Sequence, residues 1–146
     1  MLVVVATDEE YKKFKPYFKR IIKTGVGYGN VFKALKDIKR TEKILNIGYA
    51  GSNNIPIGTI CKVKHCLNYH PNTNFKEEVY CLNKDKNGYT CLTSNSFVEH
   101  TFIQTPVLFD MELYAIMSMG FKNVESIKIV SDNLSLNEYD KTTKNK

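Results

Sequence analysis

The stretch MLVVVATDEE, residues 1–10, decides the fold class, because an apolar run changes abruptly into a run of acids. Val3, Val4 and Val5 are β-branched, and a short apolar run bounded by polar residues predicts a strand that is buried on both faces. The acids that follow suit the first turn of a helix, where carboxylates stabilise the helix dipole. We therefore expect a strand over residues 1–7 and a short helix over residues 8–18, which Pro16 interrupts.

The same alternation of strand and helix continues along the chain. RIIKTGVG (20–27) and EKILNIGYAG (42–51) predict strands that end at glycines, and GNVFKALKDIKR (29–40) predicts the helix between them. A β-α-β-α-β order in a short segment is typical of a parallel sheet with helices on its faces. We expect an α/β fold with three layers, in which helices flank a mostly parallel or mixed twisted sheet.

For the second half of the chain, the sequence predicts strands, one helix and a polar tail. Extended stretches are predicted at 55–70, 76–83 and 89–97, with NKDKNGY (83–89) as a hairpin turn between the last two. A helix is predicted from Val107 to Met119, capped by Thr105 and ended by Gly120. A strand over 124–132 should follow, and the polar residues after it should fray. We expect one domain over residues 1–132 and a polar C-terminal tail over residues 133–146.

Composition narrows the class of protein. The chain has 146 residues, 42% of them hydrophobic, and a net charge of +6, which suits one domain with a real core. We expect no signal peptide, because residues 1–10 have no basic start and turn acidic after seven residues, and no apolar run reaches the ~20 residues that a membrane helix needs. Four cysteines without C-x-x-C spacing favour reduced thiols and a cytoplasmic location. The basic run over residues 12–23 is interpreted as a solvated helix face, with polyanion binding as the alternative.

Neither a metal nor a cofactor is expected. His65, Cys66 and His70 lie close together in the sequence, but their spacing fits no standard zinc pattern. The glycine-rich segment GVGYGN (25–30) matches neither a dinucleotide-binding fingerprint nor a phosphate-binding loop that ends in Gly-Lys-Ser/Thr. Tight turns between strand and helix would explain these glycines equally well.

Acidic residues follow the predicted strands. Ligands of open α/β sheets bind beyond the carboxyl ends of the strands, which is where Glu10, Ser131 and Asp132 fall. An edge rich in carboxylates and poor in cations favours a neutral, hydroxyl-rich ligand such as a sugar over a phosphate group. Asp110 and Glu112 are about 200° apart on a helix, so one of them should face something apolar or functional.

Four blocks together resemble the nucleoside phosphorylase superfamily, and within it the methylthioadenosine/S-adenosylhomocysteine nucleosidases. The blocks are VVVATDEE, TGVGYGNVFKAL, LNIGYAGSNNIPIGTI and FDMELYAIMSMGFKNVESIKIVSD, in the order in which the family has them. The last block is the most specific, because Met-Glu and Ser-Asp recur at the family's separation. The resemblance implies a shortened form of the family's fold that lacks the closing helix after Asp132.

The resemblance also implies roles for individual residues. Asp132 would protonate N7 of a purine, Glu10 would activate the attacking water, and Glu112 would bind the ribose hydroxyls. Met111 would lie at the sugar, Phe97 would stack on the base, and Val98 would offer its backbone groups to the base. Lys128 stands where the family has an arginine that helps to position the water. The other implied substrate-binding residues are Ala50, Gly51 and Ser131. Structural alternatives stay open, since Glu10 could serve the helix dipole, Glu112 could be a helix-face acid paired with a lysine, and Asp132 could cap the strand end.

The expected function is therefore hydrolysis of the N-glycosidic bond of a purine nucleoside, with release of the free base. Phosphorolysis is less favoured, because the family's phosphorylases use arginines at the two glycine turns and this chain has none there. Tyr49 departs from the family, which has a small Ser or Thr at that position. One alternative is a catalytically inactive nucleoside-binding or regulatory protein of the same fold, and another is a basic protein associated with nucleic acid. A homodimer is expected, with the contact near residues 107–119 or 55–69.

Overall fold

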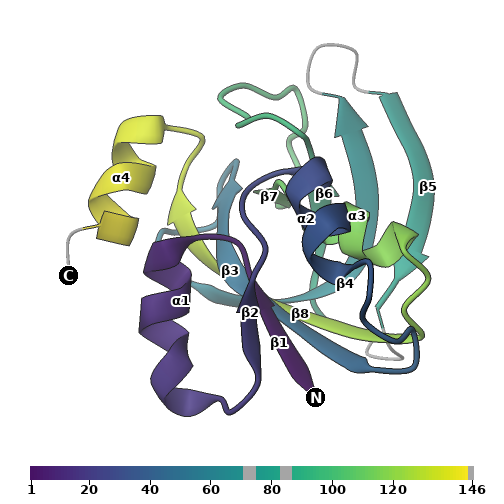
Figure 1. Ribbon diagram of the computed structural model, residues 1–146. Coiled ribbons are helices and arrows are strands. Elements are labelled where there is room, and N and C mark those ends of the chain that lie inside the picture. The colour runs from purple at the N-terminus through teal and green to yellow at the C-terminus, as the bar shows by residue number, and fades with distance from the viewer. Residues whose placement is uncertain (71–74, 83–86, 145–146) are drawn as a thin grey trace.

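The first half of the chain forms the predicted alternation of strands and helices (Figure 1). The structure is a computed structural model that describes residues 1–70, 75–82 and 87–144. Its first elements are β1 (Leu2–Val5), α1 (Asp8–Phe14), the short 3-10 helix η1 (Lys15–Tyr17), β2 (Ile21–Lys23), α2 (Tyr28–Leu35) and β3 (Lys43–Ser52). The predicted β-α-β-α-β order is therefore confirmed.

The second half is mainly strands. It contains β4 (Ile60–His70), β5 (Phe75–Cys81), β6 (Tyr89–Thr93), β7 (Leu108–Asp110), α3 (Leu113–Ser118), β8 (Asn123–Asp132) and α4 (Leu136–Lys144). The predicted extended stretches at 55–70, 76–83, 89–97 and 124–132 all contain strands.

The strands form one mixed sheet that closes on itself. β1 pairs in parallel with β2 and β3, and β3 pairs in parallel with β8. β8 continues to β4, β4 to β6, β6 to β7, and β7 returns to the end of β3, so these five strands form a closed circuit. A mixed α/β fold with flanking helices is confirmed, and the closure is an addition that local sequence patterns did not predict.

The helix predicted from Val107 to Met119 is wrong in its first half. Residues 108–110 form strand β7, which pairs with β3 on one side and β6 on the other. The helix starts only after Glu112, its N-cap residue, and runs from Leu113 to Ser118. Two neighbouring strands supply hydrogen-bond partners to this segment, and that tertiary pairing outweighs its local helical pattern.

The hairpin predicted between the second and third extended stretches is also wrong. β5 and β6 do not pair with each other, because both pair with β4, on its opposite sides. β4 and β5 are the antiparallel neighbours instead. Most of the predicted turn, residues 83–86, lies outside the described residues.

The C-terminal segment is a helix where fraying was expected. Residues 136–144 form α4, which contacts β8 and α1 (Figure 1). Ser135 Oγ accepts from the backbone N–H of Glu138 at 3.3 Å, as an N-cap side chain does. The Ser-x-x-Glu spacing of residues 135–138 is therefore a helix-start pattern that the sequence contained. The division of the chain at residue 132 stays a prediction.

The helices cover the sheet from two sides. α2 and α3 contact each other and pack on a large core that includes Leu2, Val4 and Ile44. α1 covers a smaller cluster around Val3 and Val5 on the other face. Among the described residues, no helix is long and apolar enough to cross a membrane.

Candidate active site

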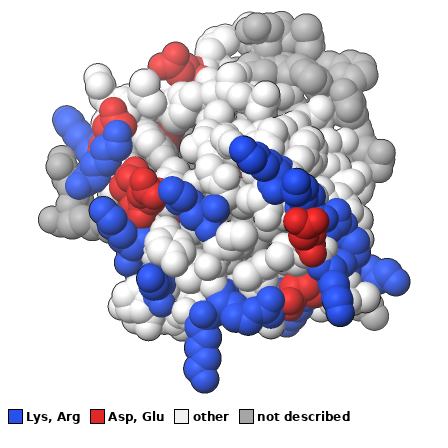
Figure 2. Space-filling view, viewed as in Figure 1, with Lys and Arg blue, Asp and Glu red and all other residues white. Residues whose placement is uncertain are grey.

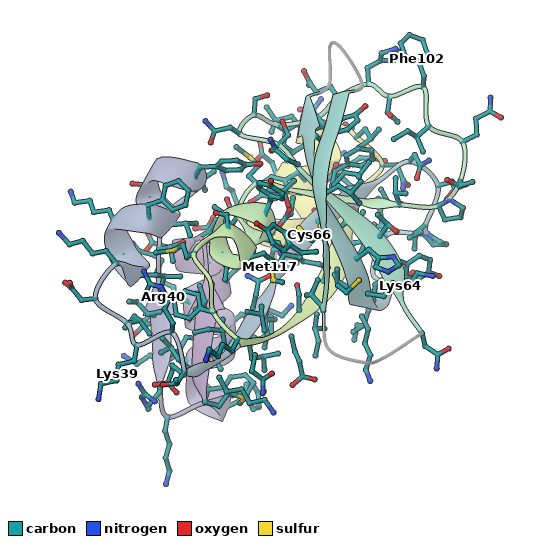
Figure 3. The ribbon with its side chains drawn as sticks, turned by 90° about the vertical axis from the view of Figure 1, so that its right-hand side faces the viewer. Lys39, Arg40, Lys64, Cys66, Phe102 and Met117 are labelled. Carbon is teal, nitrogen blue, oxygen red and sulfur yellow. The ribbon has the colours of Figure 1, made fainter. Side chains whose placement is uncertain are left out.

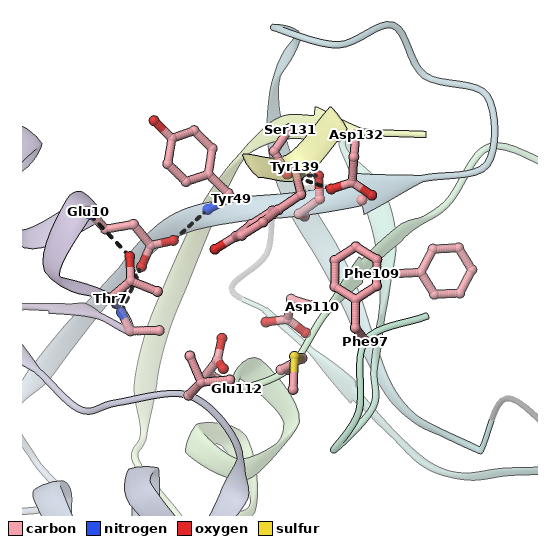
Figure 4. Close-up of a pocket in the computed structure, with 15 residues that line it drawn as sticks. Thr7, Glu10, Tyr49, Phe97, Phe109, Asp110, Glu112, Ser131, Asp132 and Tyr139 are labelled. Atoms are coloured by element: carbon pink, nitrogen blue, oxygen red, sulfur yellow. Dashed lines mark hydrogen bonds between the residues drawn. The ribbon is translucent and has the colours of Figure 1, made fainter. Parts of the chain in front are cut away.

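A cavity of about 190 Å³ lies beyond the carboxyl ends of β1, β3 and β8 (Figure 4). Its position agrees with the rule that ligands of α/β sheets bind at that edge. Its lining combines acids with apolar and aromatic side chains: Ala6, Thr7, Glu10, Val26, Tyr49, Ala50, Gly51, Phe97, Phe109, Asp110, Met111, Glu112, Ser131, Asp132 and Tyr139. In the part of the chain that the structure describes, no lysine, arginine or histidine lines this cavity.

Glu10 is fixed by backbone donors from two elements. Its Oε1 accepts from the N–H groups of Ala6 at 2.8 Å and Thr7 at 3.1 Å, while Thr7 Oγ1 accepts from the Glu10 N–H at 3.2 Å. This reciprocal pair is a capping box at the start of α1. Its Oε2 accepts from the N–H of Tyr49 on β3 at 2.8 Å. Glu10 therefore caps the helix and also lines the cavity, whereas Asp8 forms an exposed ion pair with Lys23.

Asp132 lies at the end of β8, on the other side of the cavity. Ser131 Oγ donates to its Oδ1 at 2.7 Å, and the backbone N–H of Leu134 donates to its Oδ2 at 3.0 Å. Burial raises the pKa of Asp132 above its ordinary value, although these hydrogen bonds oppose the shift. At a given pH, the protonated form of Asp132 is therefore more populated in this environment than it would be in water.

Two glycines of β3 make room for these carboxylates. A methyl group at Gly48 would lie 2.8 Å from Glu10 Oε2, and a methyl group at Gly51 would lie 2.8 Å from Asp132 Oδ2. Both distances are shorter than side-chain carbons tolerate. Gly48 and Gly51 therefore allow the carboxylates of Glu10 and Asp132 to pack directly against strand β3.

Glu112 joins α3 to the glycine-rich segment that precedes α2. Its Oε2 accepts from the backbone N–H of Gly27 at 2.9 Å. Burial is the main cause that raises the pKa of Glu112 to about 8, and the negative charge of Asp110 adds to it. Figure 4 shows the Glu112 carboxyl group below the cavity, on the side opposite Asp132.

The carboxylate of Asp110 is held by buried partners in the core, although Asp110 also belongs to the cavity lining. Lys128 Nζ lies 2.9 Å from its Oδ2, and the side chains of both residues are almost fully buried. Thr93 Oγ1 donates to Oδ1 at 2.5 Å, and the backbone N–H of Leu113 donates to Oδ2 at 2.9 Å. Burial opposes the ionised form, but the charge of Lys128 and the hydrogen bonds from Thr93, Lys128 and Leu113 together outweigh it and lower the pKa of Asp110. The pair is an internal salt bridge that anchors the turn before α3.

Tyr139 of α4 projects into the cavity between the acids (Figure 4). Its ring lies edge-to-face with Phe97, with 5.9 Å between the ring centroids. Burial raises the pKa of the Tyr139 hydroxyl, and the charge of Glu10 adds to the rise. The segment that the sequence predicts as a frayed tail therefore supplies an aromatic wall.

The structure brings most of the predicted site residues into one place. Glu10, Ala50, Gly51, Phe97, Met111, Glu112, Ser131 and Asp132 all line the cavity. Val98 lies in a small adjoining recess that shares Phe97 and Asp132 with it. Lys128 lies behind Asp110, away from the lining.

Sequence reasoning missed several lining residues. Tyr139 could have been found from the helix-start pattern at residues 135–138, and Phe109 from its place beside Asp110. Tyr49, which departs from the family's small residue, belongs to the lining, and its backbone N–H donates to Glu10. We find no sequence pattern that singles out Val26 or Ala6.

The described residues contain no group of three or more His, Cys, Asp or Glu side chains that could hold a metal ion. The side chain of His70, one of three residues considered as ligands from the sequence, lies outside the described part.

Comparison with solved structures defines the class of fold. The MTA/SAH nucleosidase of Streptococcus pneumoniae superimposes with a TM-score of 0.79 at 14% identity, over 98% of this chain and 92% of that one. For the MTAN of Chlamydia trachomatis the TM-score is 0.77 at 19% identity, over 99% and 87% of the two chains. For the futalosine hydrolase of Helicobacter pylori it is 0.75 at 12% identity, over 97% and 89%. No protein-family model and no curated protein matches this sequence.

These similarities establish the fold. The molecule is an α/β protein with a closed mixed sheet and an acid-lined cavity at its carboxyl edge. It has the fold of the nucleoside phosphorylase superfamily, to which the sequence blocks had pointed. It also spans most of the length of these neighbours, and α4 follows Asp132 where the sequence had suggested that a closing helix is absent.

Proposed function

We propose that this protein hydrolyses the N-glycosidic bond of a purine nucleoside and releases the free base. The observation that carries the proposal is the convergence of Glu10, Glu112 and Asp132, from three separate elements, on one cavity with aromatic walls. Cleavage of this bond makes the sugar positive and the base negative. The reaction therefore needs one acid that donates a proton and another that stays ionised.

Asp132 is the proposed general acid. Its raised pKa keeps a larger share of the carboxyl protonated, and a protonated carboxyl can donate to N7 of the departing purine. Phe97 and Tyr139 lie near it with their rings at an angle, so a flat base has aromatic surface to contact. Val98, in the adjoining recess, would offer backbone groups to the base.

Glu10 is the proposed general base. Its oxygens accept hydrogen bonds from three backbone N–H groups, which hold the carboxylate at the cavity wall. From there it can take a proton from water and stabilise the positive sugar of the transition state. Glu112 and Met111 would lie at the ribose, where the Glu112 carboxylate accepts from the sugar hydroxyls. The lining residues Ala50, Gly51 and Ser131 would complete the contact surface.

Water is favoured over phosphate as the attacking group. A phosphate co-substrate carries negative charge that enzymes normally neutralise with arginine, lysine or metal ions. Among the described residues, the cavity lining includes no lysine or arginine. The most deeply buried cation nearby, Lys128, is already paired with Asp110.

The test is incubation of the purified chain with a panel of purine nucleosides in phosphate-free buffer, followed by chromatography for free base. The panel should include methylthioadenosine, S-adenosylhomocysteine, adenosine and inosine, with uridine as a pyrimidine control. Base release from a purine nucleoside, unchanged when phosphate is added, is the expected result. Release that requires phosphate would make the protein a phosphorylase instead.

A nucleoside-binding protein without turnover is the second candidate. The cavity volume of about 190 Å³ is below the ~300–1,000 Å³ that is usual for ligand pockets, and Tyr139 occupies part of the space. Saturable binding of a nucleoside in calorimetry, without any base release, would select this candidate.

A further inference from the structure

A second hollow lies away from the acid cavity, between α1 with η1 and one face of the sheet. Its volume is about 340 Å³, which falls within the range of small-molecule pockets. Apart from one lysine, its lining is apolar or aromatic: Lys13, Phe14, Tyr17, Phe18, Ile47, Ile60, Ile127 and Ile129. We call this hollow the isoleucine groove.

The strand register explains why the isoleucines face the same way. Ile47 of β3 is paired with Ile127 of β8, and Ile60 of β4 is paired with Ile129. Paired residues on neighbouring strands project from the same face of a sheet. Three strands therefore build one continuous apolar floor.

Helix α1 covers only part of this face. Phe14 and Phe18 pack with Val3, Val5 and Ile47, over β1 and the nearer side of β3. The chain then turns through η1 into β2, which lies on the far side of β1 and therefore leads away from β4. Ile60 of β4 is 71% exposed, Tyr17 is 78% exposed, and Ile127 and Ile129 of β8 are partly buried.

The charges around the groove favour a negative ligand. The cation of the described lining is Lys13, at the edge of the groove. No carboxylate belongs to the described lining. Glu125, two residues before Ile127 on β8, is paired with Lys43 at 3.3 Å. Two copies of the chain placed groove to groove would bring their two Lys13 side chains toward each other, which costs electrostatic free energy.

We propose that the isoleucine groove is a second ligand site, which binds an amphipathic anion with its apolar part on Ile127 and Ile129 and its carboxylate at Lys13. An apolar chain laid along this floor covers surface that is otherwise open to water, which is the main source of affinity for such ligands. The carboxylate gains a charge-assisted hydrogen bond at the edge.

Lys13 also connects the groove to the acid cavity. Its Nζ lies 3.3 Å from the hydroxyl of Tyr49 and 5.6 Å from the centre of the Tyr49 ring. Tyr49 belongs to the lining of the acid cavity, and its backbone N–H donates to Glu10. A carboxylate at Lys13 competes with Tyr49 for the ammonium group, so binding in the groove should alter the environment of the Tyr49 ring.

The probe for this site is decanoate, added to the full chain below its micellar concentration and followed by calorimetry and by NMR. We expect saturable binding that shifts the amide signals of Ile127 and Ile129. Decanoate should bind at least tenfold more tightly than decanol, and decylammonium should bind more weakly than either. No binding of decanoate, or equal affinity for decanoate and decanol, would overturn the proposal.

Two variants and one control assign the contacts. Lys13→Gln should weaken decanoate at least tenfold and leave decanol within twofold, because only the charge contact is lost. Ile60→Asp, at an exposed position, should abolish binding of both ligands while the circular dichroism spectrum stays that of the wild type. Lys12→Gln, an exposed neighbour outside the lining, is the matched control and should leave both affinities unchanged. A dimer in light scattering that Ile60→Asp dissociates would show that a second copy occupies the groove, and would overturn the proposal.

Discussion

At the scale of single residues, environment separates the acids of the site. Glu10 is fixed by three backbone N–H groups, and Asp110 is neutralised by Lys128. Asp132 and Glu112 lie in surroundings that raise the pKa of each carboxyl. Four carboxyl groups at one cavity can thus take different tasks, because burial and neighbours set each one separately.

We predict that Asp132→Asn lowers turnover by about 10²–10⁴-fold and leaves nucleoside affinity within about tenfold. The amide can still form a hydrogen bond with the base, but it cannot deliver a proton. Single-turnover kinetics and calorimetry on the same preparation measure the two quantities. A variant with the wild-type rate would remove Asp132 from the mechanism.

We predict that affinity for ribosides rises about fivefold from pH 7 to pH 9, which is the usual difference between neutral and charge-assisted hydrogen bonds. The sign follows from the Glu112 carboxyl, whose pKa of about 8 means that the ionised, better acceptor forms only as the pH rises through that value. Binding titrations across this range measure the effect. In Glu112→Gln the profile should be flat, riboside affinity should fall, and affinity for the free base should stay. An equal loss for riboside and base would indicate a folding defect.

At the scale of elements, each acid of the cavity comes from the end of a strand or the start of a helix. β1 leads into Glu10, β3 supplies the space beside the acids, and β8 ends at Asp132. The pairing of β3 with both β1 and β8 therefore fixes the distance between Glu10 and Asp132.

We predict that Gly48→Ala lowers turnover at least tenfold and costs about 1–3 kcal/mol of unfolding free energy, as overpacking does. The added methyl group would lie 2.8 Å from Glu10 Oε2, so the carboxylate must move. Kinetics and chemical denaturation measure the two effects.

Gly29→Ala is the matched control for this prediction. Gly29 lies within α2, and a methyl group there meets no atom within 4 Å. It should keep full activity and gain about 0.5–1 kcal/mol from the helix. Full activity in Gly48→Ala would show that the exact place of Glu10 does not matter.

We predict that Tyr139→Ala raises the KM for the nucleoside about tenfold, whereas Tyr139→Phe keeps it within about twofold. The ring adds an aromatic contact, and such contacts contribute about 0.5–1.5 kcal/mol beyond the area that they bury. It also helps to exclude water from the acids. Steady-state kinetics of the two variants decide the matter. A lower KM in Tyr139→Ala would mean that the ring obstructs the cavity.

At the scale of the whole molecule, the surface carries charge of both signs. Figure 2 shows basic side chains spread over the face in view, with acidic ones between them. Within the basic run over residues 12–23, Lys23 pairs with Asp8, and Arg20 pairs with Glu42. This mixture favours the interpretation as a solvated surface over a continuous site for nucleic acid. Association with nucleic acid stays the less favoured alternative, for which salt-dependent oligonucleotide binding is the measurement.

We predict a homodimer whose contact lies at residues 99–106. Of the two regions on which a dimer contact was expected, 107–119 has apolar residues such as Leu108, Leu113 and Ile116 that are buried within one chain. The other region, residues 55–69, stays a prediction. Phe102 is 71% exposed and points away from the body of the protein (Figure 3). It stands in the segment that also carries Phe97, so a contact there would lie near the cavity.

Light scattering at tens of micromolar tests this prediction. Phe102→Asp should give a monomer near 16.8 kDa, whereas Phe32→Asp, at a partly exposed phenylalanine on α2, should leave the dimer intact. A wild-type chain that is monodisperse at the monomer mass would contradict the dimer.

The sequence by itself determined the alternation of strands and helices in the first half and the acids that follow the strands. Local rules act there, because a β-branched run such as Val3–Val5 and a capping pair such as Thr7 and Glu10 need only near neighbours. The resemblance blocks predicted three acids of the lining, since Glu10, Glu112 and Asp132 each stand within a short motif.

Only the tertiary structure decided what depends on distant partners. Residues 108–110 have a local helical pattern, yet they become a strand because β3 and β6 offer hydrogen bonds on both sides. Lys128 pairs with Asp110 inside the core, although the resemblance had placed it at the substrate. Tyr139 reaches the cavity because α4 folds back against β8 and α1. Contacts between segments far apart in the chain set these outcomes, and the free energy of such contacts is not contained in any local pattern.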